Sequence, residues 1–361
     1  MTTHTVAEFE ITRTAYLAAD GSVLDTVPDF AKDPNALLPL YRAMALTRSF
    51  DEKAIALQRT GRLGTYASVL GQEGVGVGVA SAMRADDVLL PAFRDHAAQL
   101  WRGVTLEELF LYWGGDERGS DFAVPREDFP VSIPVASHFP HAAGVALAMT
   151  LRGEDRAAVA LAGDGATSKG DFYEALNLIG VWRLPAIFVI NNNQWAISVP
   201  RDEQTAAETI AQKAIAAGLP GEQVDGNDVI AVRDAVDRAR ARAGSGDGGT
   251  LIEALTYRLG DHTTADDASR YREDSDVAPH REKEPLRRLR AYLQANQVWD
   301  DAEEAALIQD CKAKVEAAAE AYMAAAPEPS VAMFDHVYES LPDDLVAQRD
   351  AAISTETASD A

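Results

Sequence analysis

The sequence predicts an α/β fold with a mostly parallel sheet and helices on both faces. One observation is the apolar run 157–162, which has the length of a buried strand and is followed by the loop GDGATSKG. Another is the helical pattern over 171–182, which leads into a second apolar strand at 186–190 and then into three asparagines. Strand, helix and strand in this order form a βαβ unit, and such units build parallel sheets with sites at the strands' carboxyl ends.

The elements before this unit follow from helix caps and apolar spacing. Residues 1–32 are mixed and end in a loop-like TVPDF. An Asp-Pro pair then predicts a helix from 33 to about 61, because an aspartate cap followed by proline is typical of a first helical turn. A short buried strand is predicted at 87–91, and a further helix begins at Thr105, where the S/T-x-x-E pattern of a capping box occurs.

After the βαβ unit, a helix is predicted over 228–243, a strand over 251–257, and a charged helical region from about Pro285. The end of the chain, from 346, is predicted to be a frayed acidic tail. The predicted organisation is an N-terminal extension over 1–32, one α/β domain with a helical C-terminal part over 33–340, and an acidic tail over 341–361.

The composition restricts the partners. The 361 residues include 57 acidic and 33 basic side chains, a formal net charge of −24, while 47% of the residues are hydrophobic, as in ordinary globular proteins. A strongly negative field repels nucleic acids and anionic membrane surfaces, so neither is an expected partner. An acidic excess is also typical of surfaces adapted to high salt.

Cysteine usage and apolar runs restrict the compartment. Cys311 is the only cysteine, which excludes an intrachain disulfide framework, and its apolar helical surroundings predict a buried structural thiol. No apolar run approaches the roughly 20 residues that span a bilayer. The N-terminus lacks the basic start and apolar core of a secretory signal, so we expect a cytoplasmic protein.

One glycine-rich segment matches a nucleotide-binding motif by letters but not by context. Residues 244–249 match G-x-G-x-x-G by letters, but they follow a helix and precede a strand, the reverse of the order that a dinucleotide needs. We interpret them as a flexible loop, and no P-loop pattern occurs. A nicotinamide-dependent dehydrogenase therefore remains only a rival hypothesis.

The loops after the two strands of the βαβ unit predict a metal–diphosphate site. Asp164 and Asn193 lie at the carboxyl ends of neighbouring strands, and carboxylate and amide oxygens are hard ligands suited to Mg²⁺. Gly163 and Gly165 let backbone amides approach a diphosphate, and the following helix offers its N-terminus to the same anion. The alternative is two ordinary turns, because Gly-Asp-Gly and Asn-Asn are common turn formers.

These residues resemble a known family. GDGATSKGDFYEALNLIG and INNNQWAIS are similar to the thiamine diphosphate motif of the α subunits of 2-oxo acid dehydrogenase E1 components. LGQEG, LPAFRDH, SHFPHAAGVALA, QVDGNDVIAV and YRLGDHTTADDASRYR resemble other blocks of that family in the same order, over roughly residues 30–340. The resemblance implies the thiamine-diphosphate-binding fold.

The resemblance assigns roles to residues of the site. It implies that Asp164, Asn193 and the backbone carbonyl of Trp195 hold Mg²⁺, and that the amide of Gly165 or Ala166 contacts the diphosphate. The remaining implied roles are a diphosphate-binding guanidinium at Arg94 beside Phe93, an apolar wedge under the cofactor at Val135, and a loop histidine at His262 that orients groups and assists proton movement. Phe93 stands where tyrosine is commoner, and Asn191 where some members have arginine, so fewer polar contacts and less positive charge reach the diphosphate.

The resemblance also implies an activity and partners. The activity is thiamine-diphosphate-dependent oxidative decarboxylation of a 2-oxo acid, followed by reductive acylation of a lipoyl group on an E2 partner. Pyruvate is the first choice of substrate and branched-chain 2-oxo acids the second. A β subunit is expected to supply a glutamate that activates the cofactor, in an α₂β₂ heterotetramer. The alternative from another class is a non-catalytic scaffold subunit.

Overall fold

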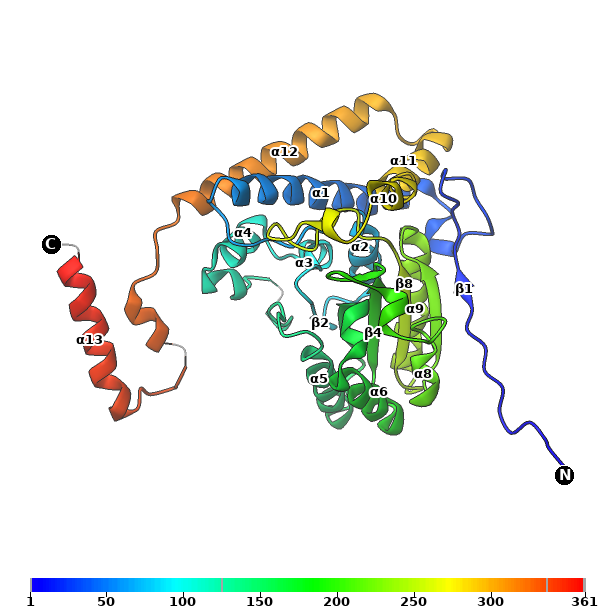
Figure 1. Cartoon of the computed structure of the whole chain (residues 1–361), viewed down its shortest axis with the longest axis horizontal. Helices are drawn as coiled ribbons and strands as arrows, with labels where there is room; N and C mark the ends of the chain where they lie inside the picture. The colour runs from blue at the N-terminus through cyan, green and yellow to red at the C-terminus, as the bar shows by residue number, and fades with distance from the viewer. Residues whose placement is uncertain (1, 125, 336, 360–361) are drawn as a thin grey trace. The chain divides into compact units, whose positions relative to one another are not determined.

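The computed structural model describes residues 2–124, 126–335 and 337–359. Over these residues a parallel sheet has the strand order β1-β7-β8-β4-β3-β2 (Figure 1). Its strands are β1 (Arg13–Thr14), β2 (Val88–Leu90), β3 (Ala158–Gly163), β4 (Ala186–Asn192), β7 (Gly221–Asp225) and β8 (Thr250–Leu255). The short strands β5 (Trp195–Ala196) and β6 (Val199–Pro200) pair antiparallel. The predicted α/β fold is confirmed.

The predicted βαβ unit lies at the centre of this sheet. β3 is followed by a 3-10 turn over Asp164–Ser168, then by α6 (Gly170–Trp182) and β4. Every residue of β4 is buried, as expected for a parallel strand covered on both faces. The register places Gly163 of β3 opposite Asn191 of β4, so the two loops that follow these strands begin side by side.

Helices cover both faces of the sheet. On one face α5 (His138–Arg152) and α6 pack on β3 and β4 through a cluster that includes Phe139 and Phe172. On the other face lie α2 (Glu73–Ala82), α3 (His96–Arg102) and α9 (Val229–Gly244). A Cβ on Gly76 would lie 2.7 Å from Ala97 Cβ, and one on Gly78 would lie 2.7 Å from Val232 Cγ1. These glycines of α2 therefore allow the helices on this face to pack closely.

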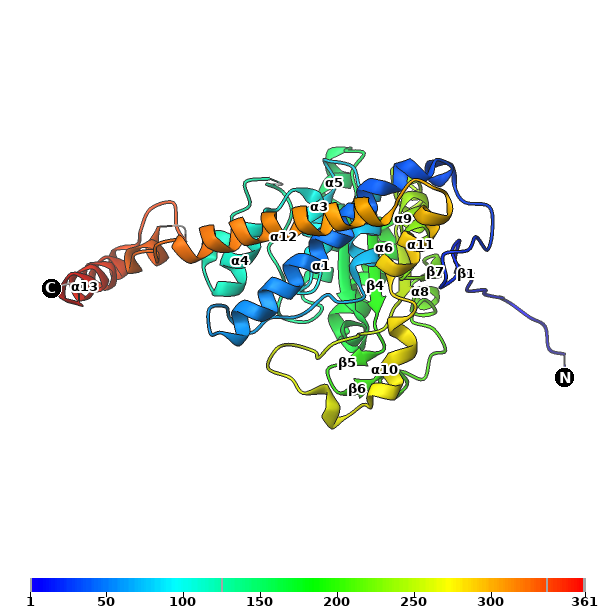
Figure 2. The same ribbon diagram turned by 90° about the horizontal axis from the view of Figure 1, so that it is seen from above.

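A third layer lies outside α2. It contains α1 (Leu38–Arg59), α11 (Pro285–Ala295) and α12 (Asp301–Ala324), and α1 and α12 run alongside each other (Figures 1 and 2). Cys311 is buried in this layer, as predicted. The remaining helices are α4 (Leu106–Gly114), α7 (Arg201–Gln204), α8 (Lys213–Ala216), α10 (Asp274–Arg281) and α13 (Asp343–Ser359).

The predicted helix starts are confirmed by their caps. The Asp33 side chain accepts a hydrogen bond from the Asn35 amide at the start of a 3-10 turn that runs into α1. Thr105 caps α4 in a complete capping box with Glu108, each side chain bonding the other residue's backbone amide. The glycine-rich segment 245–249 joins α9 to β8, so it is the loop that its order in the chain predicted.

The structure differs from the sequence prediction at the sheet edge and at the C-terminus. β1 lies within the segment predicted as an extension, and β7 was not predicted at all. Both are short and partly exposed, so they lack an apolar run, and β1 pairs with β7 far along the chain. The frayed acidic tail predicted from 346 instead lies largely in a helix, α13 (Asp343–Ser359), whose alanines favour helix.

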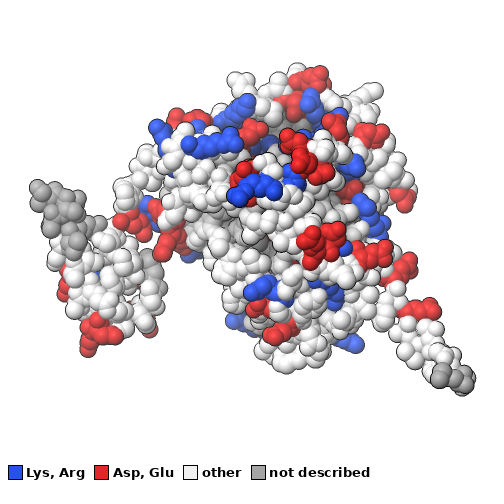
Figure 3. Space-filling view, in the orientation of Figure 1, with Lys and Arg blue, Asp and Glu red and all other residues white. Residues whose placement is uncertain are grey.

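Two compact units divide the chain, residues 1–319 and 320–361. The predicted boundaries at 32/33 and 340/341 stay predictions, and the outermost residues of those segments, 1 and 360–361, lie outside the described residues. Within the described part of the chain, no helix is long and apolar enough to cross a membrane. On the face seen in Figure 3, acidic and basic side chains are interspersed.

Candidate active site

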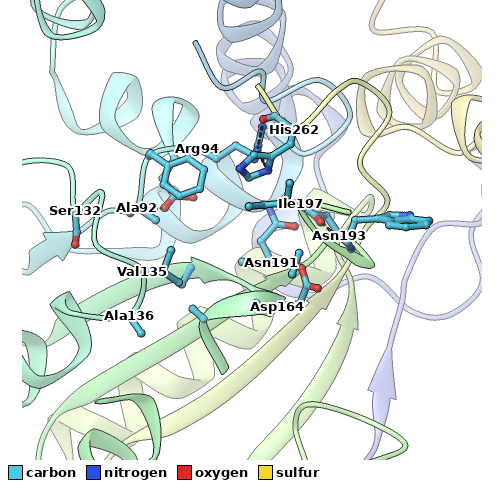
Figure 4. A pocket seen from close by; sticks show the side chains of 18 of the residues that line it. Ala92, Arg94, Ser132, Val135, Ala136, Asp164, Asn191, Asn193, Ile197 and His262 are labelled. Carbon is cyan, nitrogen blue, oxygen red and sulfur yellow. Dashed lines mark hydrogen bonds between the residues drawn. The ribbon is translucent and has the colours of Figure 1, made fainter. Parts of the chain in front are cut away.

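A cavity of about 390 Å³ lies at the carboxyl ends of β3 and β4 (Figure 4). Parallel α/β sheets place their sites at this edge. The residues predicted to bind cofactor or metal all line it: Phe93, Arg94, Val135, Gly163, Asp164, Gly165, Ala166, Asn193, Trp195 and His262. They come from five separate segments of the chain, which the sheet brings together.

Asp164 begins the 3-10 turn after β3 and is only 2% exposed. Its Oδ2 accepts a hydrogen bond of 2.8 Å from Gln204 Nε2. Burial raises the pKa of the Asp164 carboxyl, while the bond from Gln204, backbone amides and the charge of Arg258 oppose that rise. A carboxylate removed from water in this way is suited to a cation, so this residue fits a Mg²⁺ ligand.

Asn193 follows β4 and lies beside Asp164 in Figure 4. Its Nδ2 donates to Gln72 Oε1 at 3.0 Å, and its Oδ1 accepts from the Trp195 amide at 3.2 Å. The described residues contain no cluster of three or more His, Cys, Asp or Glu side chains that could hold a metal. One carboxylate with amide and carbonyl oxygens nevertheless suits Mg²⁺, which keeps waters and phosphate oxygens in its shell.

The backbone after Asn193 makes an unusual turn. Gln194 has φ 72° and Ile197 φ 56°, which is a strained conformation for a β-branched residue. The buried Arg258 holds this turn, since its Nη2 donates to Ile197 O at 2.9 Å and its Nη1 to Trp195 O at 3.5 Å. The Trp195 carbonyl predicted to bind metal is therefore held at the cavity wall.

The glycines leave room for a ligand close to the backbone. A Cβ on Gly165 would lie 2.8 Å from Ala196 Cβ, so a larger residue there would displace the β5 turn. A Cβ on Gly163 would have no atom within 4 Å, which shows open space beside it. Backbone amides in this loop can thus approach an anion, as the resemblance implies.

Arg94 and His262 meet on the opposite side of the cavity (Figure 4). Arg94 Nη2 donates to the His262 carbonyl at 2.8 Å and lies 3.3 Å from His262 Nδ1, while Nη1 donates to the Ser68 carbonyl. A guanidinium has no acceptor, so Nδ1 accepts and the proton of the neutral ring lies on Nε2. Burial and the neighbouring Arg258 lower the pKa of Arg94 to about 10, and it remains a cation at neutral pH.

The apolar wall is built from segments 92–93, 133–136 and 196–197. Val135 lies in the cavity wall with 46% of its surface exposed, and Ala136 has φ 73°. The Phe93 ring packs edge-on against His262, with centroids 5.9 Å apart. Val135 therefore lies where the predicted wedge requires it, and its role as a wedge stays a prediction.

The His262 ring predicts a pH dependence of stability. Burial, Arg94 and Arg258 lower its pKa to about 4 against the opposing charge of Asp266, so between pH 6.5 and 4 the unfolded chain binds more protons than the folded chain. The contribution of the neutral His262 ring to the free energy of unfolding is complete above pH 6.5 and is lost as the pH falls toward 4. In urea unfolding, stability should fall more steeply with falling pH for the wild type than for His262→Gln.

The comparison isolates His262, because the other buried histidines of the chain are present in both proteins and their contributions cancel. His96, whose pKa is likewise lowered by burial, to about 3, is the main example. Parallel curves for the two proteins between pH 6.5 and 4.5 would show that the ring is not held neutral by this environment.

Sequence reasoning missed three buried polar residues around the cavity. Gln72 and Asp95 line it, and burial raises the pKa of Asp95 to about 7. Asp51 accepts hydrogen bonds from three groups of segment 66–69, which in turn binds Arg94. Of the three, only Asp51 carries a sequence signal, as a polar residue among apolar neighbours in the helix predicted from 33 to about 61, and that signal does not say which distant segment its side chain contacts.

Comparisons with known proteins agree with the predicted family. The family model described as dehydrogenase E1 component matches residues 41–331. A protein of Staphylococcus epidermidis named pyruvate dehydrogenase E1 component subunit alpha is 40% identical over 347 residues, which cover 95% of this chain and 93% of that protein. A protein of the same name from Staphylococcus aureus is also 40% identical, with the same coverage.

Proposed function

Because the chain belongs to the dehydrogenase E1 component family, we propose that it is the α subunit of a thiamine-diphosphate-dependent pyruvate dehydrogenase. The observation that carries this proposal is the convergence of all ten predicted site residues on one cavity. The relatives named pyruvate dehydrogenase E1 component subunit alpha favour pyruvate as the substrate. A non-catalytic scaffold would have no need to keep these side chains together.

In this proposal Asp164, Asn193 and the Trp195 carbonyl hold Mg²⁺, which binds the diphosphate of the cofactor. Amides of the Gly165–Ala166 segment and the Arg94 guanidinium contact the same diphosphate, since a guanidinium fork suits phosphate geometry. The observations that support this are the buried carboxylate, the open backbone beside Gly163 and the cationic side chain across the cavity. When bound, thiamine diphosphate supplies the nucleophilic carbon and the electron sink for decarboxylation.

His262 is the proposed proton-handling residue of this chain. Its low pKa keeps the ring neutral at pH 7, and the contact from Arg94 to Nδ1 leaves the proton on Nε2. The ring can therefore donate a hydrogen bond to an oxygen of the 2-oxo acid and orient it. Phe93 and Val135 place apolar side chains in the same cavity wall, and a hydrogen bond is electrostatically stronger beside apolar groups than in water.

The proposed partners are a β subunit, in an α₂β₂ heterotetramer, and a lipoyl-bearing E2 that accepts the acyl group. The relatives' names contain the words subunit alpha, and three apolar cavity residues, Ile133, Val135 and Ile197, are between 46% and 54% exposed in this chain. Apolar surface at the rim of a polar site is typical of an interface.

Partner dependence is a prediction of this proposal. We expect decarboxylation by the chain alone to be slower than by the chain mixed with its β subunit by about 10²–10⁴-fold, the range of an acid–base group. The reason is that the cofactor-activating glutamate belongs to the β subunit. CO₂ release from pyruvate, measured with an artificial electron acceptor, checks this, and equal rates with and without the partner would contradict it.

The same assay with a panel of 2-oxo acids tests the substrate. We expect the highest kcat/KM for pyruvate. One methylene in an apolar pocket changes binding by only about 1–3 kcal/mol, so a 2-oxo acid one carbon longer than pyruvate should be a poorer substrate by about 10–200-fold, and the branched-chain acids, which add more than one carbon, should be poorer still. A higher kcat/KM for branched-chain acids would assign the chain to that second substrate class.

A further inference from the structure

Gln72 is a buried side chain in the cavity wall to which the proposed function gives no role. It is 1% exposed and precedes α2, and its backbone amide donates to the Val69 carbonyl at 2.8 Å. The preceding Gly71 has φ 82°, and a Cβ there would lie 2.6 Å from Leu259 Cδ1, so only glycine fits this turn. The backbone that carries the Gln72 side chain is thus fixed at the edge of the cavity.

The two ends of the Gln72 amide differ in their partners. Oε1 accepts a hydrogen bond of 3.0 Å from Asn193 Nδ2, across 121 positions of the chain. Nε2 is buried and has no hydrogen-bond partner among the residues that the structure describes. Buried donors are rarely left without an acceptor, and Gln72 lines the cavity together with Asp164 and Asn193.

The bond to Asn193 fixes which way that amide faces. Because Asn193 Nδ2 donates to Gln72, the Oδ1 atom is directed away from it, and Oδ1 is the only atom of the amide that can bind a cation. A reversed amide would present a donor to the metal and repel it. Gln72 is therefore placed to act on a metal through Asn193.

We propose that Gln72 is a positioning residue for the metal ligand Asn193 and that its Nε2 binds an anionic oxygen of the ligand that shares the metal. This inference rests on the proposed function, in which that ligand is the diphosphate of thiamine diphosphate. Phosphate oxygens are acceptors only, so they complement a buried donor that has none. In this proposal Oε1 orients Asn193 toward the metal ion, and Nε2 donates a hydrogen bond to the diphosphate bound to that ion.

Two variants separate the two roles. Gln72→Met keeps the length of the side chain but removes both the acceptor and the donor. Gln72→Glu keeps an oxygen that can accept from Asn193 Nδ2, but it replaces the donor by an oxygen. Gln99→Met is the matched control, because Gln99 is also 1% exposed and both of its polar side-chain atoms lack a hydrogen-bond partner within the described part of the chain, but it does not line the cavity.

Calorimetric titration of the full chain with its β subunit measures both affinities. Mg²⁺ is titrated at saturating thiamine diphosphate, and thiamine diphosphate at saturating Mg²⁺. We expect Gln72→Met to weaken Mg²⁺ binding by about 10–100-fold, the range for a residue that orients a metal ligand, and Gln72→Glu not to weaken it. Both variants should weaken thiamine diphosphate binding by at least about 10-fold, and Gln99→Met should match the wild type.

The outcomes that overturn the inference are distinct from failure of the proposed function. If wild-type protein binds both ligands and Gln72→Met binds both equally well, Gln72 has only a structural role. If Gln72→Glu weakens Mg²⁺ binding as much as Gln72→Met does, the contact with Asn193 is not what matters. Unchanged thiamine diphosphate affinity in both variants would mean that Gln72 Nε2 does not donate a hydrogen bond to the diphosphate. Absence of binding by the wild type would instead overturn the proposed function itself.

Discussion

Replacing Asp164 by alanine is expected to weaken Mg²⁺-dependent binding of thiamine diphosphate by more than about 100-fold, because even residues that only orient metal ligands cost 10–100-fold when removed. Asp164 is the one carboxylate among the three proposed metal ligands, so its loss removes the charge that attracts the cation. Calorimetric titration of the chain with its β subunit, with and without Mg²⁺, gives the affinities. We expect pyruvate decarboxylation to fall with them.

The matched control for this variant is Asp228→Ala. Asp228 is also buried, but its carboxylate caps α9 and accepts hydrogen bonds from the Tyr16 and Leu17 amides, and it does not line the cavity. Loss of a cap costs about 0.5–2 kcal/mol, so this variant should unfold at a lower temperature and still bind the cofactor. Cofactor binding by Asp164→Ala at the wild-type affinity would exclude the proposed metal role.

The second large effect is expected at Arg94. Hydrogen bonds to charged groups contribute about 1.5–3 kcal/mol each, and a guanidinium fork makes two of them to a phosphate, so Arg94→Ala should weaken thiamine diphosphate binding by about 10²–10⁴-fold at constant Mg²⁺. The substitution also removes the bonds that hold the His262 carbonyl and Nδ1. The thiamine diphosphate affinity of Arg94→Lys should lie between those of the wild type and Arg94→Ala, because an ammonium keeps the charge but lacks the planar fork of a guanidinium.

Arg102→Lys separates this effect from a general loss of stability. Arg102 is buried like Arg94, but it pairs with Asp128 at 2.8 Å and does not line the cavity. Its replacement should lower the unfolding temperature and leave cofactor affinity within about threefold, since the affected contacts are local. Equal affinity in wild type and Arg94→Ala would remove Arg94 from the diphosphate site.

The central part of the fold could be predicted because its signals are local. The buried strands β3 and β4 are apolar runs bounded by glycine or asparagine, and the capping box at Thr105 is four residues long. β1 and β7 carry no such signal, because each is short and partly exposed, and β1 has its partner β7 more than 200 positions away. Short, partly exposed strands of this kind are specified by tertiary pairing rather than by their own residues.

Some residues of the candidate site could likewise be predicted from the sequence, and others could not. Asp164 and Asn193 could be placed together because parallel strands align their carboxyl ends, and the resemblance added Arg94 and His262. Gln72 could not be found, because its contact with Asn193 crosses 121 positions and nothing in its neighbours indicates that contact. The supporting hydrogen bonds of a site are therefore visible only in the folded chain.

The acidic composition is compatible with an anionic ligand because the balance is local. A chain of net charge −24 repels polyanions at long range, but that field is screened over about 8 Å at physiological salt. Two cations lie at the site. Arg94 is in the cavity wall, and Arg258 donates a hydrogen bond to the carbonyl of Trp195, which lines the cavity. Mg²⁺ would add two further positive charges at Asp164.

Binding of thiamine diphosphate through Mg²⁺ in this cavity can be measured directly, because the fluorescent residue Trp195 lies in the cavity wall. Thiamine diphosphate is titrated into the wild-type chain with its β subunit, and tryptophan fluorescence is followed with Mg²⁺ and with chelator. We predict a saturable quench that requires Mg²⁺ and is much smaller in Trp195→Phe. No Mg²⁺-dependent quench, or an equal quench in Trp195→Phe, would contradict this assignment of the cavity.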